Sequence, residues 1–228
     1  MKAEKRRVCV YCDERDADTR DHVIAKCLFP KPRPSNLITV PSCDDCNSDK
    51  AIDDDFLRDY LTVDFAGSQS PTASALFEGK VRRSVKRNSS DLARSLLESA
   101  RDQPLYTKGG IYLGDAVFAP IDESRFIKLF GRIIRGLYFH YTRKIIPLSY
   151  PVEVGRVMPW DFESVWDSFS NLKFSACGPL ADVFVGGCAR VKEDPLSTWW
   201  LMTFYGRVHF SIGSVNPDLG RSLREPAA

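Results

Sequence analysis

The sequence predicts an α+β fold in which a small, metal-stapled N-terminal module precedes a larger domain of helices and antiparallel sheet. Two Cys-x-x-Cys pairs, Cys9/Cys12 and Cys43/Cys46, lie near the N-terminus. A long amphipathic helical pattern covers residues 122–144, and apolar residues alternate with period two after Pro147. The chain has 228 residues, 43% of them hydrophobic, which suits one ordinary domain with a small one attached.

The first elements of the N-terminal module can be placed from local signals. Residues 8–12 predict a knuckle, and the apolar residues 37–40 predict a short strand bounded by Pro34 and Pro41. A helix is expected to begin near Cys43, because Asp44 and Asp45 favour a helix N-terminus. Its expected buried stripe consists of Ile52, Phe56, Leu57, Tyr60 and Leu61.

The two cysteine pairs supply the four soft thiolate ligands of a closed tetrahedral site, and structural zinc is the natural occupant. The other interpretation is two unrelated thiol pairs, or a redox pair, but neither pair has a thioredoxin-like strand-helix context. Three further cysteines, Cys27, Cys177 and Cys188, are expected to be small buried residues, and a contact between the last two across a hairpin stays open. Free cysteines without a signal peptide favour a reducing cytoplasm.

The segments C-V-Y-C, D-H-V and N-L-I-T-V-P-S-C-D-D-C-N-S-D-K, within residues 8–62, closely resemble the HNH endonuclease family. The resemblance implies a treble-clef-like ββα-metal fold that binds one catalytic cation between a hairpin and a helix. By that resemblance Asp21 and Asn47 bind the cation, His22 is the general base, Asn36 orients its ring, and Lys50 contacts phosphate or stabilises charge. Asn47 replaces the more usual histidine, and residues 23–25 lack a proline that often follows Asp-His.

The chemistry of these residues agrees with the roles that the resemblance implies. Phosphodiester hydrolysis needs an activated water and a cation that neutralises charge on the phosphate. A histidine with an ordinary pKa near ~6.5 can accept the proton of water at neutral pH. Hard oxygen ligands from Asp21 and Asn47 suit magnesium or manganese. His140 and His209 have no candidate metal ligand or catalytic residue beside them in the sequence and are expected to be structural.

The net charge of +2 is too small to indicate a nucleic-acid partner, so the placement of basic residues matters more than their total. One group follows His22, and a second lies in residues 80–87; Asp53, Asp54 and Asp55 are expected on the far part of the helix. Both basic groups could bind nucleic acid, or simply form a solvated surface. The nucleic-acid-binding candidates are Lys26, Lys31, Arg33, Lys80, Arg82, Arg83, Lys86 and Arg87.

The chain is expected to divide into a nuclease module at residues 1–62, a basic linker, short helix or mobile arm at 63–90, and an α+β domain of unassigned role at 91–228. Within the last, residues 91–101 and 122–144 are expected to be helical, followed by strands near 152–157, 172–176, 183–191 and 199–212.

Some side chains of this domain have two interpretations. Four tryptophans could form a stacking platform for bases, although core packing is the usual role. The long helix is expected to bury Phe126, Ile127, Phe130, Ile133, Ile134, Leu137 and Tyr141, and to expose Arg132, Arg135, Arg143 and Lys144.

Together these observations predict a metal-dependent endonuclease that hydrolyses DNA, with DNA favoured over RNA by the resemblance alone. The alternatives are a non-catalytic, zinc-dependent module that binds nucleic acid or protein, and an RNA-cleaving toxin or defence effector. One active site per chain cuts one strand at a time, so double-strand cleavage would require a homodimer or two successive events. No stretch approaches the ~20 apolar residues of a membrane span.

Overall fold

The computed structural model describes residues 8–87, 101–107, 109–118 and 122–222, and the predicted α+β class is confirmed. The N-terminal part contains strands β1 (Thr19–His22) and β2 (Thr39–Ser42), the short helix η1 (Lys26–Leu28) and helix α1 (Asp44–Val63). β1 and β2 pair antiparallel, with His22 opposite Thr39 and Arg20 opposite Pro41. The described module therefore runs strand, strand, helix, in the order that the sequence indicates.

β2 lies two residues further along the chain than predicted, and it includes Pro41 instead of stopping before it. The hairpin has only two strands, so a residue without an N–H group is tolerated where it faces away from the partner strand. The Pro41 carbonyl accepts a hydrogen bond from the Val10 N–H at 3.1 Å. This bond ties β2 to the first cysteine knuckle.

Helix α1 begins where predicted, with Cys43 as its N-cap residue and Asp44 and Asp45 in its first turn. The predicted stripe is wrong at Ile52, which is 59% exposed, while Leu57 and Leu61 are fully buried. Asp53, the residue after Ile52, is buried instead. Its carboxylate pairs with Arg125 of a second helix at 2.9 Å, which compensates for its burial. The acidic run is therefore not a solvated far face.

The segment predicted as a linker, short helix or arm contains several short helices between Phe65 and Lys86. It contains α2 (Phe65–Ser68), α3 (Pro71–Leu76), the π-helical turn η2 (Phe77–Val81) and α4 (Arg82–Lys86). The segment packs on α1 and buries Ala73, Leu76 and Val81. These three apolar residues recur at helical spacing, which attaches the basic residues of α4 to the body of the protein.

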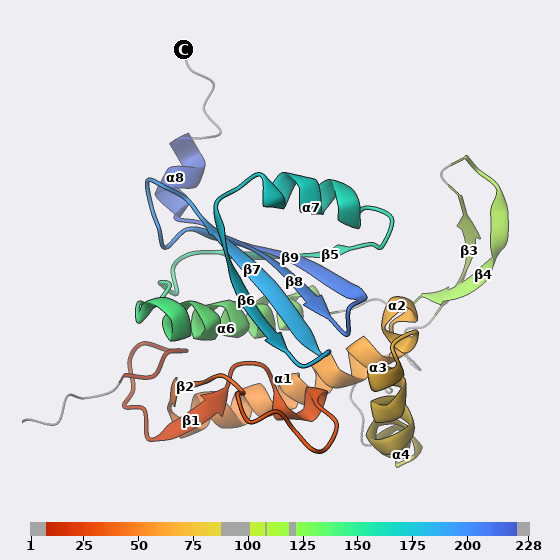
Figure 1. Ribbon diagram of the computed structural model, residues 1–228, viewed down its shortest axis with the longest axis horizontal. Helices are drawn as coiled ribbons and strands as arrows, with labels where there is room; N and C mark the ends of the chain where they lie inside the picture. The colour runs from red at the N-terminus through yellow and green to blue at the C-terminus, as the bar shows by residue number, and fades with distance from the viewer. Residues whose placement is uncertain (1–7, 88–100, 108, 119–121, 223–228) are drawn as a thin grey trace, which may run out of the picture.

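The hairpin of β3 (Arg101–Tyr106) and β4 (Tyr112–Phe118) has no counterpart in the sequence prediction. It projects away from the rest of the molecule (Figure 1). The helix predicted for residues 91–101 lies outside the described residues except for Arg101, which begins β3.

Helix α6 (Glu123–Thr142) falls within the predicted range and begins at Asp122, whose carboxylate accepts a hydrogen bond from the Arg125 N–H. The predicted burial is confirmed for Phe126, Phe130, Ile133, Ile134 and Leu137, but Ile127 (40% exposed) and Tyr141 (50% exposed) were assigned wrongly. Arg135 is also not solvated; it is 9% exposed. Arg132 pairs with Asp49 and Asp53 of α1, so this face of α6 contacts protein and not water.

The antiparallel sheet is confirmed and has the strand order β5-β9-β8-β7-β6. Its strands are β5 (Val152–Val157), β6 (Phe174–Leu180), β7 (Phe184–Arg190), β8 (Thr198–Phe204) and β9 (Val208–Ser214). Residues 199–212 form two strands because Tyr205 and Gly206 both adopt positive φ, at 51° and 66°, and make a tight turn. Helix α6 covers one face of the sheet, and α7 (Phe162–Ser170) lies on the other; α8 (Pro217–Ser222) follows β9 (Figure 1).

One hydrophobic core extends from the sheet and α6 into the N-terminal module. The Tyr205 hydroxyl donates to the Leu28 carbonyl at 2.9 Å, and a smaller cluster around Phe169 lies under α7. Cys177 and Cys188 are buried as expected, and Cys27 is partly buried. Of the tryptophans, Trp200 is buried and Trp199 partly buried, whereas Trp160 and Trp166 are exposed.

His209 should make the stability of this sheet depend on pH. Its ring is buried, stacks on Phe162 at 3.9 Å and bonds the Thr203 hydroxyl at 2.9 Å. Burial, assisted by Arg156, lowers the pKa of His209 to about 4. The unfolded chain then binds the proton more readily than the folded one, so stability is complete above pH ~6.5 and falls as the pH drops toward 4.

We expect the free energy of unfolding to fall by up to about 1.4 kcal/mol per pH unit in this window through His209. Urea unfolding of the wild type and of His209→Gln at pH 7, 6 and 5 isolates the contribution, because other titrating groups are common to both chains. Parallel pH dependences in the two proteins would contradict the assignment.

Candidate functional site

The four paired cysteines converge on one point between the first knuckle and the start of α1. Their sulfur atoms all lie within 4.8 Å of one another. A tetrahedral zinc ion with Zn–S bonds near 2.3 Å requires sulfur atoms about 3.8 Å apart, so the arrangement fits such an ion. This is the single group of three or more His, Cys, Asp or Glu residues with that proximity in the part of the chain that the structure describes.

The electrostatics of the cysteine cluster also fit a cation. Burial acts to raise the pKa of Cys9, but N–H groups of Cys43, Cys12 and Tyr11 point at its sulfur and bring the pKa down to about 7. Burial, together with the neighbouring thiols, raises the pKa of Cys46. Four negative sulfurs at this distance repel one another, and a divalent cation relieves that repulsion.

Asp21 lies near the end of β1 and is held against α1 by a buried polar network. Its Oδ2 accepts a hydrogen bond from the Tyr11 hydroxyl at 2.6 Å and lies 3.2 Å from Lys50 Nζ. Lys50 is fully buried; it also donates to both oxygens of Asp54 at 2.9 Å and to the His22 carbonyl at 3.0 Å. The ammonium group therefore fixes both the Asp21 side chain and the His22 backbone.

This position of Lys50 bears on the role that the family resemblance implies. A side chain with no exposed surface does not reach a phosphate in solvent, whereas it does compensate the charge of two neighbouring carboxylates. Burial raises the pKa of Asp54 to about 6, against the effect of Lys50. Lys50 is a positioning residue in this geometry, and Asp54 accepts the remaining hydrogen bonds of its ammonium group.

Asn47 lies one turn before Lys50 on α1 and faces β1. Its Nδ2 donates to the Thr19 hydroxyl at 3.3 Å, and that hydroxyl donates in turn to the Ser42 carbonyl at 2.8 Å. Because the Thr19 proton is already committed, the hydroxyl can only accept from Asn47, which orients the amide nitrogen toward β1. The amide oxygen is then left for another partner. Thr19 and Asp21 are two residues apart on β1 and share a face.

His22 is half-buried at the end of β1, and its surroundings are basic. Burial lowers the pKa of His22, and Lys26, Lys50 and Arg33 lower it further, whereas Asp21 raises it. The Arg33 guanidinium donates to the Lys26 carbonyl at 3.0 Å, so the two basic residues lie together beside the ring. No hydrogen bond joins Asn36 and His22 among the described residues; Asn36 is exposed in a turn before β2.

The basic residues of the two predicted groups border one stretch of α1. Lys26 and Arg33 lie beside His22, and Lys31 is exposed in the same loop. On the other side, Lys80, Arg83 and Arg87 line a hollow of about 320 Å³ together with Asp55 and Arg58 of α1. The neighbouring Cys27 sulfur lies 3.3 Å from the Asp54 carbonyl, which connects the two sides. Arg82 pairs with Glu78 at 2.6 Å, and the side chain of Lys86 lies outside the described part.

Helix α6 supports the segment that carries His22. A methyl group at Gly136 would lie 2.7 Å from Cγ2 of Val23, closer than packed carbon atoms approach. The glycine therefore lets α6 pack directly on the residue that follows His22. This contact joins the strand that carries His22 to the helix that covers the sheet.

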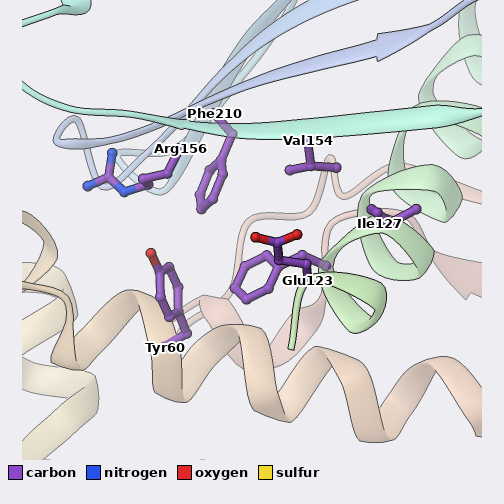
Figure 2. Close-up of a pocket in the computed structure, with 7 residues that line it drawn as sticks. Tyr60, Glu123, Ile127, Val154, Arg156 and Phe210 are labelled. Carbon is purple, nitrogen blue, oxygen red and sulfur yellow. The ribbon is translucent and has the colours of Figure 1, made fainter. Parts of the chain in front are cut away.

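A separate pocket of about 330 Å³ opens where α1, α6 and the sheet meet. Figure 2 shows the Tyr60 ring rising from α1 and the Glu123 carboxylate extending from α6 beneath Val154, while the Arg156 guanidinium turns away from Glu123. Arg156 is engaged by Asp64 at 3.2 Å. None of the residues assigned to the site lines this pocket, so it is not the candidate active site.

Three residues that organise the site have little or no signal in the sequence. Tyr11 lies inside the first knuckle, Thr19 begins β1, and Asp54 belongs to an acidic run that resembles a solvated surface. Lys50 and Asp54 do have the i, i+4 spacing of a helical ion pair. That spacing was the one available signal for Asp54.

Comparison with protein-family models, with curated proteins and with solved structures yields no match for this chain. Within the described residues, no helix has both the length and the apolar character that crossing a membrane requires.

Proposed function

We propose that the chain is a metal-dependent endonuclease that hydrolyses phosphodiester bonds in DNA, with structural zinc at the four cysteines. The observation that carries the proposal is the Lys50 network, which holds Asp21 and His22 of β1 against the first turns of α1. A hairpin followed by a helix, with Asp21 and His22 at the end of the first strand and Asn47 in the first turn of the helix, is the order of elements that the HNH resemblance implies.

Asp21 and Asn47 would hold the catalytic cation. Tyr11 and Lys50 occupy Oδ2 of Asp21, and Oδ1 makes no hydrogen bond to the described residues, while the Thr19 contact leaves the Asn47 oxygen free. Two hard oxygen donors suit magnesium or manganese. When bound, such a cation would neutralise charge on the phosphate and on the leaving oxygen.

His22 would accept the proton of the attacking water. Burial and the basic residues around it lower the pKa of His22, which favours the neutral imidazole that a base requires, and the Lys50 bond to its carbonyl fixes the backbone from which the ring extends. Asn36 would orient the ring only after its turn moves toward His22, because the described geometry contains no such bond.

The basic residues on both sides of the Asp54–Arg58 stretch of α1 would contact the DNA backbone. Lys26, Lys31 and Arg33 would lie next to the scissile phosphate, and Lys80, Arg83 and Arg87 further along the strand. Such contacts add affinity without sequence preference. Cleavage of both strands would again require a second copy or a second event.

The competing function is a zinc-dependent binding module without catalysis. It draws support from the burial of Asp21 and the engagement of its Oδ2 by Lys50, since a purely structural carboxylate would be held in the same way. The two functions differ in one requirement, because only the nuclease needs a second, exchangeable cation.

Calorimetric titration of the zinc-loaded chain with manganese tests this requirement. We expect one further site per chain that Asp21→Ala abolishes and that Asp167→Ala, a change to an exposed carboxylate on α7, leaves intact. If the wild type binds no manganese beyond its zinc, or if Asp21→Ala binds it unchanged, the nuclease proposal fails.

A further inference from the structure

A second hollow lies on the sheet, far in sequence from the cysteine pairs. It is a groove of about 740 Å³ on the face of the sheet that also carries α7. Helix α7 covers the part of that face around Val157, Ala189 and Leu201. The groove occupies the part toward the end of β9, where the chain continues into α8 (Figure 1).

The floor of the groove is made by two glycines. A methyl group at Gly213 would meet no atom within 4 Å, and one at Gly155 would meet a single atom, the Ser211 oxygen, at 3.9 Å. Both residues lie within strands, where side chains normally fill the surface. Glycine weakens a strand, so two of them under open space indicate a place where another molecule approaches the backbone.

The register of the strands sets the walls of the groove. Gly213 of β9 lies opposite Glu153 on one side and opposite Trp199 on the other. With strands about 4.8 Å apart, the carboxylate and the indole stand on either side of a gap roughly 10 Å across. Glu153 is exposed and Trp199 partly buried.

The indole of Trp199 is held in place by protein contacts. Its Nε1 donates to the Ser211 hydroxyl at 2.6 Å, and the Phe169 ring meets it at 5.3 Å in an edge-on arrangement. A ring fixed at its edges in this way presents a preformed surface to the groove, which a planar ligand can use without an ordering cost.

The chemistry of the lining identifies the ligand class. An aromatic side chain stacks with any nucleobase, and a carboxylate accepts hydrogen bonds from the N–H groups on the edge of a base. Lys173, between α7 and β6, lines the groove on the side away from Glu153, where its ammonium group can meet a phosphate. A planar ring with N–H donors on one side and an anion on the other is a nucleotide.

We propose that this groove binds an unpaired nucleotide of a DNA strand, with its base between Trp199 and Glu153 and its phosphate toward Lys173. The choice of a DNA strand as the source of the nucleotide rests on the proposed function. Nucleotide binding by the groove does not, because it is inferred from the residues that line the groove. A carboxylate can only accept, so bases that present two adjacent donors, as guanine does, should bind best. In a nuclease, this site would hold a single-stranded stretch beside the duplex.

Fluorescence anisotropy with a labelled, guanine-containing single-stranded oligodeoxynucleotide tests the proposal. The titrations use the full chain carrying His22→Ala, without added magnesium or manganese, so that cleavage does not enter. Gly213→Val fills the groove at a strand position that accepts a β-branched residue, and it should weaken binding about tenfold or more. Trp199→Ala should do the same, and Glu153→Gln should remove the preference for guanine.

Trp166→Ala is the matched control, because Trp166 is an exposed tryptophan on α7 that does not line the groove. It should bind the oligonucleotide as the parent does, and Gly213→Val should keep the parent's thermal midpoint. If Gly213→Val and Trp199→Ala both bind like the parent, the groove is not the site. Equal affinity for free dGMP and for the oligonucleotide would overturn DNA as the source.

The nuclease activity and the nucleotide groove are tested by different outcomes. Oligonucleotide binding that depends on Gly213, in a chain that cleaves no plasmid with magnesium or manganese, supports the groove and overturns the nuclease. If the wild-type chain cleaves plasmid but oligonucleotide binding is unchanged by Gly213→Val and Trp199→Ala, the nuclease is supported and the groove is overturned.

Discussion

Cys43→Ser is expected to unfold the N-terminal part of the chain and to remove its zinc. Cys43 is both one of the four converging sulfurs and the N-cap residue of α1, so its loss affects the metal and the helix that carries Asn47 and Lys50. Structural zinc contributes about 10–16 kcal/mol of apparent free energy in small sites at neutral pH, and three thiolates retain only part of it. Because one core joins the module to the sheet, the thermal midpoint of the whole chain should fall.

The measurement is zinc content by elemental analysis together with thermal unfolding followed by circular dichroism. Cys177→Ser is the control, because it makes the same replacement at a buried thiol outside the cluster. It should keep one zinc per chain and lose little stability. A Cys43→Ser chain with full zinc content and an unchanged midpoint would refute the zinc staple.

His22→Ala should lower DNA cleavage by about 10²–10⁴-fold, the usual contribution of a general base, while DNA binding persists. The ring makes no hydrogen bond within the described structure, so its removal leaves the Lys50 network and the fold in place. The comparison is conversion of supercoiled plasmid to nicked or linear forms with magnesium or manganese, beside a gel shift with the same DNA.

His140→Ala serves as the matched control for this variant. His140 lies on α6, half-buried against Tyr141, and touches none of the site residues. It should cleave at the wild-type rate. Equal cleavage by His22→Ala and the wild type would exclude His22 as the base, and loss of activity in both histidine variants would point to a general defect.

The sequence predicts those parts of the fold that depend on regular periodicity. The long helix α6 and strand β5 were located to within two residues because their apolar spacing is regular and their ends carry Asp122 and Pro151. The β3–β4 hairpin escaped prediction because its exposed residues include tyrosine, isoleucine and leucine, which interrupt the expected alternation.

For the site, the sequence indicates which cysteines lie together, but it does not predict the burial of Lys50 or the partners of its side chain. The four sulfurs converge as predicted. Each Cys-x-x-Cys spacing lets two thiols ligate one ion, and the fold brings the two pairs together. The burial of Lys50 depends on Asp21 and Asp54, from different elements, and on Tyr11 from a third. No local pattern reveals a network of that kind, because its members meet only after the chain has folded.

The packing of α6 against the N-terminal elements has an evolutionary consequence. Where a catalytic unit is joined to its neighbour by a tether alone, recombination can exchange the neighbour and leave the chemistry intact. Here the residue after His22 rests on Gly136, and the Leu28 carbonyl bonds Tyr205, so the two parts share contacts that any exchange would break. The parts of this chain are therefore expected to have diverged together, with compensating changes on either side of these contacts, and not to have been shuffled independently.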